Sequence, residues 1–227
     1  MNFSSEHLLV TTFLKNSKVF FTKATGRKLN RHYILKEFNS GYGVADIVLG
    51  SFTPYLSSRT LRNPIDSNWA VTLVDILDDE LFTISDFASK YGVSKQTAQK
   101  KINQFVAAGF LKIKKQHYSK FNDYKIAVDT SIAIEAKLKN WKQALNQARR
   151  YKRFANFSYV LLDSHFSSPA KQNIHLFQQH NIGLISMDGN KPIIHYSPKQ
   201  MEVRENHYFY KLNEIVYDYF RENYGYS

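Results

Sequence analysis

The sequence of 227 residues contains no cysteine. Disulfide bonds, thiolate zinc sites and cysteine nucleophiles are therefore excluded, and any metal must be held by carboxylate, carbonyl or imidazole ligands. The chain also lacks a run of about 18 uncharged apolar residues, which a membrane-spanning helix needs. Its first 16 residues lack the order of basic, apolar and small residues that marks a signal peptide. From these absences we expect a soluble, cytoplasmic protein.

Low-complexity tracts and internal repeats are also missing, whereas apolar residues are plentiful. Hydrophobic residues make up 43% of the chain and aromatic residues 15%, so a packed core is expected and global disorder is excluded. At roughly 150 residues per domain, the length predicts one core and one small additional module.

The chain carries a net charge of +12, and two long segments of it contain no acidic residue. Residues 87–122 contain eight lysines, and residues 137–153 contain seven lysines and arginines. Residues 202–227, by contrast, contain five acids and three cations. This distribution favours a polyanionic partner. Nucleic acid is favoured over a membrane, because neither basic segment has the wide apolar face of an interfacial helix.

The hydrophobic pattern outside residues 64–128 predicts a mixed sheet flanked by helices, which is an α/β class. A capped helix is expected from Ser4 to about residue 16, followed by a hairpin of strands 33–38 and 44–49 around a turn at 39–43. The later segments alternate between the strand period of two residues and the helix period of about 3.6 residues. They predict strand 131–138, helix 141–155, strand 157–162, helix 171–180, strands 182–187 and 192–196, and helix 208–224.

Residues 64–128 show a different pattern, with helices expected at 68–79, 83–90 and 94–108 and strands at 110–114 and 124–128. A basic loop would join the two strands. Two short runs are characteristic here. Gly92-Val93-Ser94-Lys95-Gln96-Thr97 forms the turn and the start of the third helix, and Gly109-Phe110-Leu111 follows that helix. This segment resembles the winged helix-turn-helix family of DNA-binding domains.

That resemblance implies that the third helix lies in the major groove of double-stranded DNA and that the wing contacts the backbone. On the helix, Lys95, Gln96, Lys100 and Lys101 are expected to lie off the apolar stripe. The full set of expected DNA-contacting residues is Lys95, Gln96, Thr97, Lys100, Lys101, Lys114, Lys115 and Lys120. A merely solvated lysine-rich face is the alternative.

Strand 131–138 carries the first candidate for catalytic chemistry. Its period of two places Glu135 and Lys137 on one face and apolar residues on the other. A second carboxylate from a neighbouring strand would complete an oxygen site for Mg²⁺, and Asp46 in strand 44–49 is the obvious one. The alternative is an exposed ion pair between Glu135 and Lys137, worth at most about 1 kcal/mol.

Asp46, the Glu135-Ala136-Lys137 strand and the helix with Gln147 and Tyr151 together resemble the PD-(D/E)xK nuclease superfamily, whose fold is restriction-endonuclease-like. The resemblance implies that Asp46 and Glu135 bind Mg²⁺ or Mn²⁺ and that Lys137 serves catalysis. It also implies that Gln147 and Tyr151 help to position metal or DNA, as in the RecB-like branch. Tyr151 could equally be a core aromatic residue.

A first-helix acid assists the metal in some members of that superfamily, and Glu6 would be its counterpart here. A residue favoured by the helix dipole is the alternative for Glu6. The 89 positions from Asp46 to Glu135 exceed the family's usual connection, and an inserted module at 64–128 accounts for most of them. The expected domains are therefore a nuclease core, 1–63 and 129–227, and an inserted winged helix, 64–128.

These observations lead to the expectation of a metal-dependent DNA endonuclease that hydrolyses phosphodiester bonds, with the winged helix holding duplex DNA, and with a homodimer as one form. Two alternatives stay open. One is a DNA-binding regulator whose nuclease core is silent. The other is a subunit of a defence or transposition complex that needs a protein partner.

Overall fold

A computed structural model describes residues 2–78 and 80–225, which form two compact units. Unit 1 comprises residues 2–52 and 128–204, and unit 2 comprises residues 53–127 and 205–225. Residues 53–63 and the C-terminal helix are expected in the core from the sequence, but the structure assigns both to unit 2. The helix belongs there because its Tyr210 is part of the apolar core of that unit.

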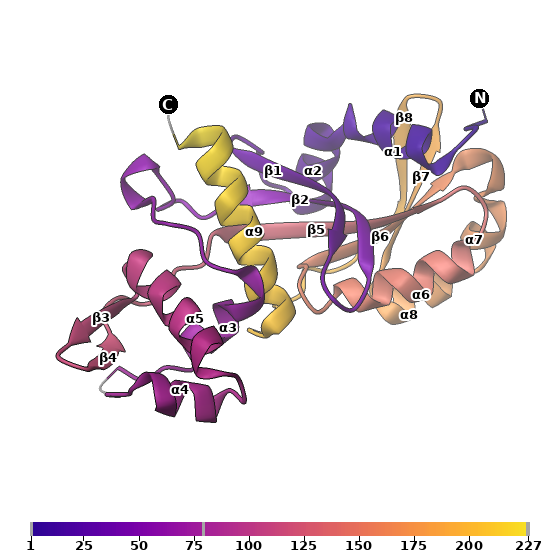
Figure 1. The fold of residues 1–227 in the computed structure, drawn as a ribbon. Helices are drawn as coiled ribbons and strands as arrows, with labels where there is room; N and C mark the ends of the chain where they lie inside the picture. Colours follow the sequence, from indigo (N-terminus) through magenta and orange to yellow (C-terminus); the bar gives the residue numbers. More distant parts are fainter. Residues whose placement is uncertain (1, 79, 226–227) are drawn as a thin grey trace. The chain divides into compact units, whose positions relative to one another are not determined.

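Unit 1 is built on a six-stranded sheet with the order β1-β2-β5-β6-β7-β8 (Figure 1). The strands are β1 (His32–Asn39), β2 (Val44–Phe52), β5 (Val128–Lys137), β6 (Phe157–Asp163), β7 (Gly183–Asp188) and β8 (Lys191–Tyr196). Strands β5, β6 and β7 are mutually parallel, whereas β1, β2 and β8 pair antiparallel with their neighbours. The predicted mixed α/β class and the β1–β2 hairpin are confirmed.

Helices cover both faces of this sheet (Figure 1). The apolar core on one face is formed with α1 (Glu6–Leu14) and α2 (Ser17–Thr25), and strand residues such as Phe157 and Tyr159 point into it. The intervening residue Ser158 points to the other face, where its hydroxyl donates to the Ala148 carbonyl oxygen at 2.6 Å. That carbonyl belongs to α6 (Trp141–Tyr151), which is followed by α7 (Ser168–Gln172) and α8 (Ile174–His180).

Helix α6 forms because Asn140 caps its start and because its buried side chains recur at helical spacing. The Asn140 side chain accepts a hydrogen bond from the backbone N–H of Gln143 at 3.2 Å. The buried stripe consists of Trp141, Ala144, Leu145, Ala148 and Tyr151.

The helices of unit 1 differ from the expected ones in three places. Helix α2 was not predicted, because it buries the adjacent pair Phe20 and Phe21, which is not a simple helical repeat. The helix expected at 141–155 ends at Tyr151. The helix expected at 171–180 is two short helices, because Asn173 leaves the helical conformation between them.

Unit 2 contains a helical part and a two-stranded sheet. Its elements are the 3₁₀ turns η1 (Ser58–Thr60) and η2 (Ser67–Trp69), helices α3 (Ala70–Val74), α4 (Ile84–Lys90), α5 (Lys95–Ala107) and α9 (His207–Tyr224), and strands β3 (Leu111–Lys114) and β4 (His117–Lys120). The expected starts of α4 and α5 are confirmed by side-chain caps. Thr83 and Asp86 form a reciprocal capping box, and Ser94 caps α5 through the N–H of Thr97.

Two expectations for unit 2 are wrong. The helix expected at 68–79 is only a 3₁₀ turn and the short helix α3. The strand expected at 124–128 is also absent, because β4 follows β3 after a tight turn at Lys115 and Gln116. Tyr118 on β4 exchanges two backbone hydrogen bonds with Phe82, at 3.1 and 2.8 Å, and packs on its ring. These bonds stabilise a strand at residues 117–120, earlier in the sequence than the strand expected at 124–128.

A buried ion pair joins α9 to the rest of unit 2. Arg62 binds the carboxylate of Glu214, which is fully buried on α9. The Tyr124 hydroxyl donates to the same carboxylate at 2.7 Å, and the guanidinium group of Arg62 lies 4.0 Å from the ring centre of Tyr217. Within the two described ranges, no helix combines the length and the apolar composition that crossing a membrane requires.

Candidate functional site

The carboxyl end of β5 brings two carboxylates from neighbouring strands face to face. The last paired residues of β2 and β5 are Ile47 and Ile134, and the same antiparallel register places Asp46 opposite Glu135. Directly opposite residues point to the same face of a sheet, with Cβ atoms about 5 Å apart. Both residues are predicted from the sequence, but only the strand register places them together.

Asp46 is held at this end by the backbone of β5. Its Oδ2 atom accepts a hydrogen bond from the Ala136 N–H at 2.6 Å, so the carboxylate acts as the acceptor where the strand pairing ends. Burial raises the pKa of the Asp46 carboxyl above its usual range, and the negative charges of Glu37 and Glu6 add to this effect. The hydrogen bond from Ala136 and the charge of Lys137 oppose it.

Glu135 is almost completely buried, with 1% of its surface exposed. Burial raises the pKa of its carboxyl group, and repulsion from Asp46 raises it further, whereas hydrogen bonds from Tyr151 and Lys137 lower it. The Tyr151 hydroxyl contacts Glu135 Oε2 and also lies 2.5 Å from the Val44 carbonyl oxygen. A phenol has one proton to donate, so it cannot donate fully to both acceptors. Tyr151 is therefore a core residue on α6 and also a direct neighbour of the buried carboxylate.

Lys137 links the site to the first helix. Its Nζ atom lies 3.0 Å from Glu135 Oε1 and 3.3 Å from Glu6 Oε2, and Glu6 is the first residue of α1. Burial alone would lower the pKa of Lys137, but the carboxylates of Glu135, Asp46 and Glu6 outweigh burial and raise it. The ammonium group is therefore kept in its charged form.

Gln147 lies one helical turn before Tyr151 on α6. Its Oε1 atom is buried and has no hydrogen-bond partner within the described part of the chain. A buried carbonyl oxygen without a donor is costly, so this atom is suited to a ligand. Across residues 2–78 and 80–225, no group of three or more His, Asp or Glu residues is arranged as a preformed metal site.

Glu37 is a neighbour of this site that the sequence analysis missed. In the β1–β2 register, Lys36 pairs with Ile47 and Phe38 with Ala45, which leaves Glu37 beside Asp46. Glu37 adopts a left-handed conformation with φ of 51°, while the pairing of β1 with β2 keeps the same register on both sides of it. The hairpin pattern in the sequence could have revealed this proximity, but not the left-handed conformation of Glu37.

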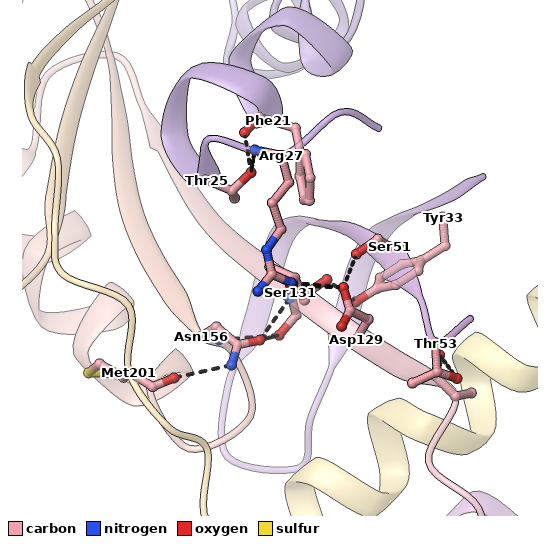
Figure 2. A network of polar contacts seen from close by, with 12 residues as sticks. Phe21, Thr25, Arg27, Tyr33, Ser51, Thr53, Asp129, Ser131, Asn156 and Met201 are labelled. Carbon is pink, nitrogen blue, oxygen red and sulfur yellow. Dashed lines mark hydrogen bonds and ion pairs between the residues drawn. The ribbon is translucent and has the colours of Figure 1, made fainter. Parts of the chain in front are cut away.

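The other end of β5 is anchored by a separate polar network (Figure 2). Asp129 Oδ2 accepts hydrogen bonds from Arg27 at 3.1 Å and from the Ser51 hydroxyl at 2.9 Å. Asn156 accepts from the Ser131 N–H at 2.9 Å and donates to the Met201 carbonyl oxygen at 3.1 Å. These bonds hold the start of the strand, at the end opposite to Glu135 and Lys137.

Basic side chains lie beside Tyr151 at the tip of the β1–β2 hairpin. The guanidinium groups of Arg150 and Arg153 lie 5.8 and 4.3 Å from the ring centre of Tyr42, which is 47% exposed. Both arginines are exposed and belong to the second basic segment seen in the sequence. The hairpin tip and the end of α6 therefore form a positively charged edge next to the carboxylates.

In unit 2, several of the predicted DNA-contacting residues lie on the surface. Lys95, Gln96 and Lys100 are exposed along α5, and Lys114 and Lys115 are exposed where β3 turns into β4. These five side chains are available to an external partner.

Three other predicted contact residues are engaged within unit 2. Lys101 is buried and binds Asp66, because it lies three residues after Ala98 and so shares the inward face of α5. The expectation that Lys101 lies off the apolar stripe is wrong. Lys120 binds Asp78 at 2.6 Å and Asp123 at 2.7 Å. Thr97 is half-buried and takes part in the cap of α5.

Comparison with known proteins finds no matching family model, no matching curated protein and no matching solved structure.

Proposed function

We propose that this chain is a divalent-metal-dependent DNA endonuclease whose active site is the carboxyl end of β5. The observation that carries the proposal is the pairing of two carboxylates, Asp46 and Glu135, on facing positions of adjacent strands, with the ammonium group of Lys137 beside them. The finer fold proposed for unit 1 is restriction-endonuclease-like, in keeping with the order of Asp46, Glu135, Lys137, Gln147 and Tyr151.

The donor set at this site fits Mg²⁺ or Mn²⁺. Burial raises the pKa of both carboxyl groups, and the charge of Asp46 raises that of Glu135 further, so a bound cation would stabilise both carboxylates in their charged form. Mg²⁺ is commonly held by one or two carboxylates while it keeps several waters. Two further features are consistent with a site that is completed by a ligand. The buried Gln147 oxygen has no donor, and the single proton of the Tyr151 hydroxyl is shared between two acceptors. Asp46 and Glu135 would hold the metal, with Glu6 close enough to assist.

A divalent metal in such a site lowers the pKa of bound water and polarises a phosphate oxygen. The residues of this chain supply the remaining functions. Lys137 is kept protonated by three carboxylates, so it is suited to stabilising negative charge on a phosphate and not to removing a proton. Tyr151 orients the Glu135 carboxylate, and Arg150 and Arg153 offer positive charge to the DNA backbone.

We propose further that unit 2 contains a winged helix that holds duplex DNA. The order α4, turn, α5 and hairpin β3–β4 supports this assignment. Its contacts would be made by the exposed residues Lys95, Gln96, Lys100, Lys114 and Lys115. Lys101 and Lys120 are left out of this surface because Asp66, Asp78 and Asp123 neutralise them.

Plasmid cleavage tests the enzymatic proposal. Wild-type protein should nick or cut supercoiled DNA with Mg²⁺ or Mn²⁺ but not with EDTA. Asp46→Ala, Glu135→Ala and Lys137→Ala should each abolish cleavage while duplex affinity changes by no more than a few fold. Asp188→Ala, an exposed carboxylate at the end of β7, is the matched control and should retain activity. Normal cleavage by any two of the three site variants would exclude this site.

One observation favours a second candidate, a DNA-binding protein with a silent core. Lys137 already pairs with Glu6 and Glu135, so two of the carboxylates have a cation without any metal. In that case no metal would restore cleavage, whereas duplex binding would be intact. A complex that cuts only with a protein partner would instead become active when the products of neighbouring genes are added.

A further inference from the structure

Unit 2 contains a cavity of about 670 Å³ that the proposed nuclease site and the exposed face of α5 do not use. It is lined by the end of the β3–β4 hairpin and by the segment that contains η1, with Tyr55, Arg59, Phe121 and Lys125 among its walls. All of its lining residues belong to unit 2. The volume is in the range of small-molecule sites, which is about 300–1,000 Å³.

Two aromatic side chains of this cavity are unusually exposed, and each has a lysine beside it. Phe121 is 60% exposed and Tyr55 is 42% exposed. The Nζ atom of Lys112 lies 5.5 Å from the ring centre of Phe121, and that of Lys125 lies 6.0 Å from the ring centre of Tyr55. Exposed rings next to ammonium groups are the elements with which proteins bind unpaired nucleic acid strands, by base stacking and by attraction of phosphate.

The cavity is lined by four cations and by the aspartates Asp78 and Asp123, and with Glu214 bound to Arg62 these charges leave one net positive charge for an anionic ligand (4 − 3 = +1). Two of its cations are neutralised internally, since Arg62 binds Glu214 and Lys120 binds a pair of aspartates. Arg59 and Lys125 form no ion pair with any described residue, and both line the cavity. These two cations are therefore available to a phosphate group.

We propose that this cavity binds nucleotides of an unpaired DNA or RNA strand, with bases stacked on Phe121 and Tyr55 and phosphates bound by Arg59 and Lys125. This site is distinct from the duplex-binding surface of α5 and does not depend on metal or cleavage. An acidic peptide could satisfy the two cations, but it would leave both aromatic rings exposed to water. The rings therefore favour a nucleobase.

Fluorescence anisotropy with a labelled oligodeoxythymidylate of about 10 nucleotides tests this proposal, and the length matches the site size of single-strand binders. The measurement is made in EDTA on the full chain, so its outcome is independent of nuclease activity. Phe121→Ala and Tyr55→Ala should each weaken binding by about 5-fold to 150-fold, which is the contribution of stacking per base. Leu81→Ala removes an equally exposed apolar side chain of unit 2 outside the cavity and should not change binding.

Two further variants separate stacking from apolar contact and from misfolding. Phe121→Trp keeps an aromatic surface and should bind at least as well as the wild type, whereas Phe121→Leu should bind as poorly as Phe121→Ala. Unchanged affinity of Phe121→Ala and Tyr55→Ala would overturn the proposal. It would also be overturned if polyglutamate displaced the oligonucleotide as efficiently as unlabelled oligodeoxythymidylate at equal charge, since the ligand would then be an acidic peptide.

Discussion

The carboxylates at the end of β5 should destabilise the metal-free protein, and Asp46→Asn is the substitution that reveals this effect. Asparagine keeps an oxygen that can accept the hydrogen bond from the Ala136 N–H, so the substitution removes charge and little else. It relieves repulsion with Glu135 and with the nearby Glu37 and Glu6. We therefore expect the variant to be more stable than the wild type in EDTA.

The magnitude follows from the register. Two unit charges about 5 Å apart, at an effective dielectric constant of about 20, repel each other by about 3 kcal/mol. The attraction between Lys137 and Asp46, which the substitution also removes, offsets part of this gain. A net gain of about 1–2 kcal/mol in the free energy of unfolding is expected, which corresponds to a rise in Tm of about 3–8 °C.

The effect of pH gives an internal check. A carboxyl group whose pKa is raised by folding favours the folded state below its unfolded pKa, near 3.8 for Asp46 and 4.5 for Glu135. That contribution is lost as pH rises through the raised pKa of the folded protein. The stability advantage of Asp46→Asn should therefore grow as pH increases from about 4 to neutrality.

Thermal unfolding with and without Mg²⁺ completes the experiment. At about 100 times its Kd, Mg²⁺ should stabilise the wild type by about 2.7 kcal/mol, and Asp46→Asn should lose most of this gain. Asp188→Asn removes an exposed carboxylate three strands away from β2 and should follow the wild type. A lower Tm for Asp46→Asn in EDTA, or a wild-type Tm that Mg²⁺ and Mn²⁺ leave unchanged, would refute the reasoning.

Two predictions concern unit 2. Lys95→Ala combined with Lys100→Ala should weaken binding to duplexes of any sequence and reduce the salt slope by about two, because each lysine releases condensed counterion from one phosphate. Lys101→Ala should leave that slope unchanged in titrations at several salt concentrations, and an equal effect of Lys101→Ala would contradict the assignment. Arg62→Ala should cost about 3–5 kcal/mol in denaturant unfolding, since it leaves the Glu214 carboxylate buried without its cation. A cost below about 1 kcal/mol would contradict this account of the buried ion pair.

Local sequence features were sufficient to predict much of unit 1. The alternation in β5 placed Glu135 and Lys137 on one face, and the structure agrees because the direction of a strand side chain depends only on its position in the strand. The start of α6 in unit 1 and the starts of α4 and α5 in unit 2 were similarly predictable. A cap such as Ser94 acts on a backbone N–H only three residues away.

Tertiary structure alone decided which charges meet. Lys101 lies on the inward face of α5, but the charge that it meets there, Asp66, is 35 residues earlier in the chain. Glu37 lies beside Asp46 in the β1–β2 register, with a left-handed backbone that no local pattern predicts. Helix α9 was predicted as a helix, yet its assignment to unit 2 depends on Arg62, 152 residues before Glu214. The physical reason is common to all three cases. Helix periods, strand alternation and caps arise from interactions over a few residues, whereas burial and ion pairing depend on segments that only the folded chain brings together.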